Sequence, residues 1–222
     1  MVLIKAVVFD LDGTLASFNL DYQTIKTEVR DYLLKRGVPA LMLSVSLSVF
    51  GLLRRTEVYF KFTGKSAKVL KEVRMEALAI AEKYELEAAM CTSLLSGAVE
   101  TLNALRRMNL KIGLCTINSD KSVDCILQRF KLGEFFDVTV PRNRVKYVKP
   151  HREHLEVVLK ALGSASKSTV VVGDSGVDMS CAKKLKVIAI GFDTGSSAMK
   201  QLTDKGANYV ITALIDLPVL IE

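Results

Sequence analysis

Short apolar runs rich in valine and isoleucine recur along the chain, and each ends in a polar residue or glycine. Runs of this kind are typical of strands buried on both faces of a parallel sheet. Between them lie segments with apolar residues every three or four positions, as in 97–108 and 154–162, which indicates helices. The alternation predicts a doubly wound, Rossmann-like α/β fold. The runs are residues 2–9, 110–115, 169–172, 187–190 and 209–211.

One long interval breaks this alternation. Residues 16–92 contain no strand pattern and read as helical throughout. Asp21 can cap a helix that runs to Arg36, and the stretch 65–89 is rich in Ala, Glu and Lys, as long helices are. We therefore predict a core of residues 1–15 and 93–222, with an inserted helical cap of residues 16–92.

The segment 38–53 is apolar apart from three serines. It is shorter than the ~18–20 residues that a membrane-spanning helix needs. We expect it to form a helix that is buried inside the cap or at a subunit contact, because an exposed apolar patch of this length promotes association. No membrane partner is expected. A subunit contact would make the protein a homodimer, and the sequence does not decide between a monomer and a dimer.

Composition is that of a globular protein. Half of the 222 residues are hydrophobic, a quarter are charged, and the formal net charge is +7. A net positive charge attracts anions in general, including phosphate esters. The basic residues are scattered and there is no tryptophan, so a nucleic-acid partner is not expected.

The cysteines form no CxxC pair and lie in or beside apolar runs, where a reduced cysteine behaves as a small hydrophobic residue. The first ten residues lack the charged start and cleavage pattern of a signal peptide. Both features favour a cytoplasmic protein. The four cysteines are Cys91, Cys115, Cys125 and Cys181.

Two carboxylates follow the first apolar run, in the sequence Phe9-Asp10-Leu11-Asp12-Gly13. Open parallel sheets bind ligands at the carboxyl ends of their strands. Residues two apart in extended backbone point to the same side, so Asp10 and Asp12 can converge on one ligand. A plain Asp-Gly turn after a strand is the competing interpretation.

Three later pieces of the chain carry further polar candidates. Thr116 comes after the run ending at Cys115, and Lys149 precedes a helix. Asp174 and Asp178 follow another strand, four residues apart, so that both can face one cation. Taken singly, each could be a helix cap or a solvated side chain. The complete set predicts a site for a hard cation beside a phosphate group.

The constellation resembles the haloacid dehalogenase superfamily, in its phosphatase branch with a small helical cap, as in phosphoglycolate phosphatase-like enzymes. Asp10 and Asp12 match the DxDGT motif, and Asp174 with Asp178 matches GDxxxD. Thr116 and Lys149 match the less specific second and third motifs. Two departures exist: Ile117 separates Thr116 from Asn118, and Lys146 is a second candidate for the motif-three lysine.

The resemblance implies a mechanism. Asp10 attacks phosphorus to form an aspartyl-phosphate, and Asp12 protonates the leaving group and later activates water. Mg²⁺ is held by Asp10, the backbone carbonyl of Asp12 and Asp174. Thr116 and Lys149 bind the phosphoryl group, and Asp178 orients Lys149 or a metal-bound water. The implied substrate is a small phosphorylated metabolite.

Other functions remain open on the sequence: a phosphomutase, a dehalogenase acting at carbon, and a non-catalytic phosphate-binding protein. Asp12 argues against the dehalogenase, because expelling halide requires no proton. Gly64-Lys65-Ser66 lacks the first glycine of a P-loop. His151 and His154 are interpreted as exposed helix residues. The basic cluster in the cap is interpreted as a solvated face; it comprises Arg54, Arg55, Lys61, Lys65 and Lys68.

Overall fold

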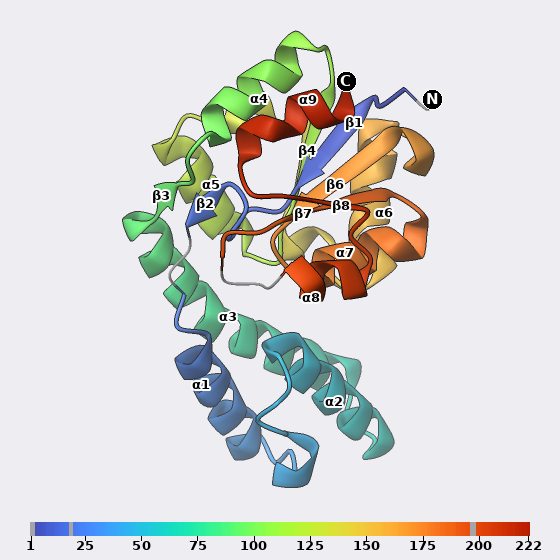
Figure 1. Cartoon of the computed structure of the whole chain (residues 1–222). Coiled ribbons are helices and arrows are strands. Elements are labelled where there is room, and N and C mark those ends of the chain that lie inside the picture. Colours follow the sequence, from blue (N-terminus) through green and yellow to red (C-terminus); the bar gives the residue numbers. More distant parts are fainter. Residues whose placement is uncertain (1–2, 18–19, 196–198) are drawn as a thin grey trace. The chain divides into compact units, whose positions relative to one another are not determined.

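The computed structural model describes residues 3–17, 20–195 and 199–222. The chain divides into two compact units (Figure 1). The core unit is Met1–Phe18 with Ala89–Glu222, and the helical unit is Asn19–Ala88. We describe each unit by itself. The assignment of residues 16–92 as a cap that covers the core stays a prediction.

The core unit is built on a six-stranded parallel sheet in the order β5-β4-β1-β6-β7-β8. The predicted doubly wound parallel α/β fold is confirmed. All five predicted runs contain a strand, and β5 was missed because Thr139 separates its two valines, so that no apolar run marks it. The strands are β1 (Ala6–Phe9), β4 (Lys111–Cys115), β5 (Val138–Val140), β6 (Thr169–Gly173), β7 (Ile188–Phe192) and β8 (Tyr209–Ile211).

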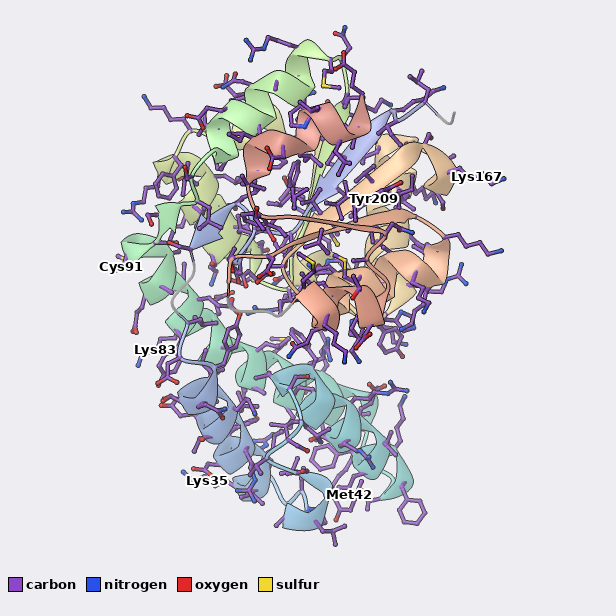
Figure 2. All side chains as sticks on the ribbon, in the orientation of Figure 1. Lys35, Met42, Lys83, Cys91, Lys167 and Tyr209 are labelled. Atoms are coloured by element: carbon purple, nitrogen blue, oxygen red, sulfur yellow. The ribbon has the colours of Figure 1, made fainter. Side chains whose placement is uncertain are left out.

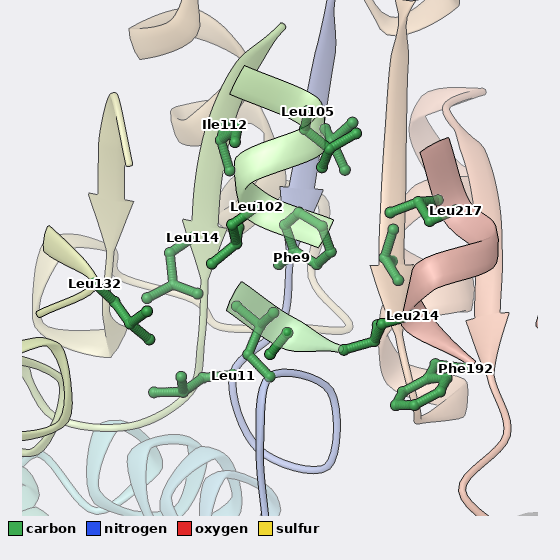
Figure 3. Close-up of a cluster of buried hydrophobic side chains, with 14 of the residues drawn as sticks. Phe9, Leu11, Leu102, Leu105, Ile112, Leu114, Leu132, Phe192, Leu214 and Leu217 are labelled. Carbon is green, nitrogen blue, oxygen red and sulfur yellow. The ribbon is translucent and has the colours of Figure 1, made fainter. Parts of the chain in front are cut away.

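The central strand β1 shows why these runs form a buried sheet. All four of its residues are buried, and their side chains alternate between two hydrophobic clusters. Val7 and Phe9 belong to the cluster that includes Leu102 of helix α4 (Ala98–Arg107), as Figure 3 shows for Phe9. Ala6 and Val8 belong to the cluster on the other face. Burying a side chain the size of Phe9 contributes about 1.5–3 kcal/mol.

Helices cover both faces of the sheet. One face carries α4, α5 and α9, and α4 and α9 lie side by side (Figure 1). The other face carries α6, α7 and α8. The helices predicted over 97–108 and 154–162 are confirmed. The helices of the core unit are α4 (Ala98–Arg107), α5 (Asp120–Arg129), α6 (Arg152–Leu162), α7 (Gly176–Leu185), α8 (Met199–Lys205) and α9 (Leu217–Ile221), with 3-10 turns at Gly133–Phe135, Arg142–Arg144, Ser166–Ser168 and Leu214–Asp216.

A two-stranded antiparallel sheet that the sequence did not reveal lies where the chain leaves and re-enters the core unit. Strand β2 (Ala16–Ser17) pairs antiparallel with β3 (Ser93–Leu94). The guanidinium of Arg129 donates to the carbonyl of Thr92 at 2.7 Å. Two-residue strands carry no periodic signal, so only the tertiary pairing identifies them.

The helical unit contains only helices among its described residues. Its own buried cluster includes Ile25 and Leu33 of α1. Asp21 caps α1 as predicted, with its carboxylate accepting from the backbone N–H of Thr24 at 3.0 Å. The hydroxyl of Tyr32 donates to Glu76 of α3 at 2.6 Å. The helices are α1 (Tyr22–Lys35), α2 (Val49–Phe62) and α3 (Ala67–Cys91), with a 3-10 turn at Ala40–Met42.

The prediction of one continuous helix over 38–53 is wrong. After the short 3-10 turn the chain is irregular until Val49, and Leu41 and Val45 are 86% and 74% exposed. Serine hydroxyls compete for backbone groups here, as Ser44 does for the N–H of Ser46 at 3.3 Å. Much of the remaining apolar surface is buried in the cluster of the helical unit, through Leu43, Val49, Leu52 and Leu53.

In residues 3–17, 20–195 and 199–222, the structure has no helix that combines the length and the apolar character needed to cross a membrane.

Candidate functional site

The predicted site residues follow three neighbouring strands at one edge of the sheet. Asp10 follows β1, Thr116 follows β4 and Asp174 follows β6, and β1 lies between the other two strands. The backbone N–H of Asp10 continues the β-ladder by donating to the carbonyl of Val172 at 2.9 Å. Parallel strands bring their carboxyl ends together, so residues far apart in the chain meet here.

Asp10 forms a buried cluster with Lys149 and Asp178. The ammonium nitrogen of Lys149 lies 2.8 Å from Oδ1 of Asp10 and 2.5 Å from Oδ1 of Asp178. Burial raises the pKa of Asp10 to about 7, and the charge of Asp178 adds to this rise while Lys149 opposes it. Burial would lower the pKa of Lys149, but the two carboxylates outweigh burial and hold it well above its usual range.

Lys149 differs from the other lysines in its environment. Lysines such as Lys35, Lys83 and Lys167 project from the surface (Figure 2), whereas Lys149 is 6% exposed. Lys146, the other candidate from the sequence, is exposed and has its ammonium 5.1 Å from the ring centroid of Tyr147. The structure therefore brings Lys149 to the carboxylates.

His154 is buried, which corrects the prediction of two exposed histidines. Its Nδ1 accepts from the backbone N–H of Lys149 at 3.2 Å, and its Nε2 lies 3.0 Å from the carbonyl of Val140. Burial, and next the charge of Lys149, lowers the pKa of His154 to about 4. A neutral ring with its proton on Nε2 satisfies both contacts. Only His151, which caps α6, is exposed.

Asp174 completes a group of three carboxylates. One ligand oxygen from each of Asp10, Asp174 and Asp178 lies within 4.8 Å of the others. Burial raises the pKa of Asp174 to about 6, and the charge of Asp178 adds to the rise. A cation beside these oxygens would favour their charged forms. Oxygen donors of this type are those that Mg²⁺ prefers, so the residues present fit the ion.

Two glycines make room for these carboxylates. Gly13 has a φ of +72°, and a Cβ there would lie 2.1 Å from Oδ2 of Asp174. Gly173 ends β6, and a Cβ there would lie 2.6 Å from Cβ of Asp178. Any larger residue would displace the carboxylate, so these positions of the two motifs require glycine.

Asp178 lies in the first turn of α7 and is almost fully buried. Its Oδ2 accepts from the hydroxyl of Ser175, and its Oδ1 accepts from Lys149. Carboxylates near a helix N-terminus are favoured by the helix dipole. Lys149 therefore contacts Asp178 as well as Asp10, and Ser175 is a neighbour of Asp178 to which no sequence pattern pointed.

Asp12 is half-buried and contacts Asn118. The side-chain nitrogen of Asn118 donates to Oδ1 of Asp12 at 2.9 Å. The hydroxyl oxygen of Thr116 accepts from the backbone N–H of Asn118 at 3.2 Å. In the sequence Asn118 stands out only because Ile117 separates it from Thr116, and no pattern pointed to its contact with Asp12.

The cysteines are free in the described part of the chain. Cys91 is exposed (Figure 2), Cys125 is half-buried, and Cys115 and Cys181 are buried. Burial raises the pKa of the Cys181 thiol to about 11. Thiols with raised pKa are poorly reactive, so the buried Cys115 and Cys181 act as core residues.

Comparison with known sequences identifies relatives of this arrangement. Residues 7–192 match a family described as haloacid dehalogenase-like hydrolase. Pyrophosphatase PpaX of Bacillus cereus strain Q1 is 28% identical over 181 residues, which are 79% of this chain and 77% of that protein. PpaX of Bacillus mycoides strain KBAB4 is 32% identical over 124 residues, 54% of this chain. The matched region spans 57% of that protein, and only 37% of PpaX of Bacillus cereus strain AH820.

Solved structures share the fold over the whole chain. A predicted phosphatase from Clostridium acetobutylicum superposes with a TM-score of 0.68 at 21% identity, covering 99% of this chain and 98% of that one. A putative β-phosphoglucomutase from Thermotoga maritima gives 0.64 at 22% identity, covering 98% of each chain. At these identities the likeness concerns the fold.

Proposed function

Because the chain belongs to the haloacid dehalogenase-like hydrolase family, we propose that it is a magnesium-dependent phosphatase acting on a small phosphate monoester. The observation that carries the proposal is the buried cluster of Asp10, Lys149 and Asp178, with Asp174 beside it. At the end of a central strand, a buried carboxylate is suited to act as a nucleophile, and the lysine paired with it is suited to bind an anion.

In the proposed reaction, a carboxylate oxygen of Asp10 forms a bond to phosphorus while the bond to the ester oxygen breaks. Asp12 gives its proton to the departing oxygen. In the second step water attacks phosphorus, Asp12 takes a proton from that water, and the bond between Asp10 and phosphorus breaks. The products are the alcohol and inorganic phosphate. Dividing hydrolysis into two displacements lowers each barrier.

Mg²⁺ would be held by Asp10, the backbone carbonyl of Asp12 and Asp174. Support comes from the raised pKa values of Asp10 and Asp174, which are caused first by burial and next by the negative charge of Asp178. The ion would supply positive charge against the phosphoryl oxygens when bound. We assign Thr116 and Lys149 to binding those oxygens, because a buried hydroxyl and a buried ammonium stabilise developing negative charge.

The decisive experiment is a phosphate-release screen of the purified protein against phosphate monoesters in the presence of Mg²⁺. We expect release from at least one small alkyl phosphate, and loss of release in Asp10→Asn. No release from any ester, or undiminished release in Asp10→Asn, would contradict the proposal. The expected partner is a small phosphorylated metabolite, and the expected location is the cytoplasm.

Inorganic pyrophosphate is a second candidate substrate, favoured by the relatives named pyrophosphatase. The same residues could act on it, because the leaving group is then phosphate instead of an alkoxide. Phosphate leaves without strong acid assistance, so Asp12→Asn should impair pyrophosphate cleavage less than alkyl ester cleavage. Including pyrophosphate in the screen separates the two candidates.

A further inference from the structure

The side chain of Asn118 contacts Asp12 between the ends of two neighbouring strands, β4 and β1. It follows β4, while Asp12 follows β1, and its side-chain nitrogen donates to Oδ1 of Asp12 at 2.9 Å. Asn118 is 1% exposed. A buried amide must find hydrogen-bond partners within the protein, and this one is directed at the carboxyl group that the proposed reaction uses for proton transfer.

The backbone of Asn118 is held on both sides. Its N–H donates to Oγ1 of Thr116 at 3.2 Å, and its carbonyl accepts from the backbone N–H of Arg142 at 3.0 Å. The guanidinium of Arg142 also donates to the carbonyl of Ile117 at 3.2 Å. These contacts fix the turn after β4. The extra residue, Ile117, thus sets Asn118 at the place from which its amide reaches Asp12.

We propose that Asn118 is a positioning residue that fixes the orientation of the Asp12 carboxyl group. This inference rests on the proposed phosphatase function. The amide donates a hydrogen to Oδ1, so the transferable proton is carried on Oδ2. The proton moves from Oδ2 to the ester oxygen as the bond from phosphorus to that oxygen breaks. Asn118 itself exchanges no proton and touches no reacting atom.

The consequence is a selective defect when the amide is removed. A rotated carboxyl group no longer presents Oδ2 to the leaving oxygen, and misplacement by about 1 Å can cost on the order of 10²-fold in rate. For Asn118→Ala we expect kcat for an alkyl phosphate to fall roughly 10- to 100-fold, with KM nearly unchanged. Release of 4-nitrophenolate in a single turnover should fall much less, because this leaving group departs without a proton.

Two further variants separate positioning from packing. Asn118→Asp keeps the shape of the side chain but, when ionised, loses both N–H donors, so it should show the same selective defect. Asn103→Ala is the matched control, because the side-chain amide of Asn103 also donates a hydrogen bond, to the backbone carbonyl of Val99 at 3.0 Å, but lies on the exposed face of α4. It should retain wild-type kinetics. Thermal unfolding of each variant establishes whether it is folded.

A double-mutant comparison gives the sharpest test. If Asn118 acts through Asp12, adding Asn118→Ala to Asp12→Asn should change the rate less than about twofold, because the effects of coupled residues are non-additive. Equal rate losses for both leaving groups, no loss in Asn118→Ala, or a full additional loss in the double variant would each overturn the inference.

A spectroscopic readout is independent of turnover. The side-chain amide resonance of Asn118 should shift in the NMR spectrum of Asp12→Ala, because its hydrogen-bond acceptor is removed. An unmoved resonance would overturn the contact whether or not the protein is a phosphatase. If the wild-type protein releases no phosphate while the resonance does shift, the proposed function fails, and the positioning role for this reaction is overturned with it.

Discussion

Lys149 and Asp10 form a buried ion pair, with the ammonium nitrogen 2.8 Å from Oδ1 and side-chain exposures of 3% and 11%. The same ammonium contacts Asp178. Lys149 therefore lies between two buried carboxylates and balances part of their negative charge. Removing one member of a buried pair leaves an uncompensated charge, so this lysine is the most informative position for substitution.

We expect Lys149→Met to reduce kcat/KM by about 10²–10³-fold, since a preorganised charge at the phosphoryl group is lost. Lys146→Met is the matched control, because Lys146 is exposed and lies only three residues earlier; it should stay within about twofold of wild type. Steady-state kinetics with the best ester from the screen measures both. Equal losses in the two variants would contradict the assignment of Lys149.

Chelation should abolish turnover and Mg²⁺ should restore it, because three carboxylates within 4.8 Å repel a phosphate dianion. Asp174→Asn should raise the Mg²⁺ concentration needed for half-maximal rate by at least about tenfold, since a charged ligand is lost. Asp204→Asn, on the exposed surface of α8, is the control. Undiminished turnover in EDTA would refute the metal assignment.

Asp12→Asn should leave Mg²⁺ binding nearly unchanged, because only the backbone carbonyl of Asp12 is proposed as a ligand. Turnover of an alkyl phosphate should slow by roughly 10²–10⁴-fold, the usual scale of general acid–base catalysis. The first step with an aryl phosphate should suffer less. Equal slowing of aspartyl-phosphate formation for both esters would show that Asp12 is not the general acid.

Gly13→Ala and Gly64→Ala form a matched pair, because both glycines have a φ of +72°. Each alanine should cost on the order of 1 kcal/mol through its left-handed backbone. Only at Gly13 would the new Cβ collide with Asp174, whereas nothing lies within 4 Å at Gly64. Gly13→Ala should therefore lose Mg²⁺ binding and turnover, and Gly64→Ala should keep both. Calorimetric titration with Mg²⁺ and thermal unfolding distinguish the two effects.

The stability of the protein should fall in acid through His154. Its pKa is lowered from 6.5 to about 4 in the folded state, so the unfolded chain binds the proton more tightly. This stabilisation is fully present above about pH 6.5 and is lost as the pH falls toward 4, by about 2 kcal/mol between pH 7.5 and 5. The charged groups that act on the ring are Lys149 and Asp178.

Urea unfolding at the two pH values measures this effect. The decrease in unfolding free energy should be about 2 kcal/mol smaller in His154→Gln than in wild type, and comparison with wild type removes contributions from the carboxylates. His151→Gln, at the exposed helix cap, should keep the wild-type decrease. The same decrease in all three proteins would show that His154 does not carry the effect.

The sequence by itself determined the fold class and the candidate residues. The sequence indicates that strand β1 is buried on both faces, because all four of its residues are apolar and no polar residue alternates with them. Asp10, Asp12, Asp174 and Asp178 stand out because carboxylates directly after such strands meet at one edge of a parallel sheet. Both inferences depend on local periodicity, which a single sequence records.

Tertiary structure alone decided the contacts between segments. The choice between Lys149 and Lys146, the burial of His154 and the reach of Asn118 to Asp12 all depend on which loops meet above the sheet. Hydrogen bonds and ion pairs between residues distant in the chain leave no periodic signal in the sequence, because they arise only after packing has brought those residues together.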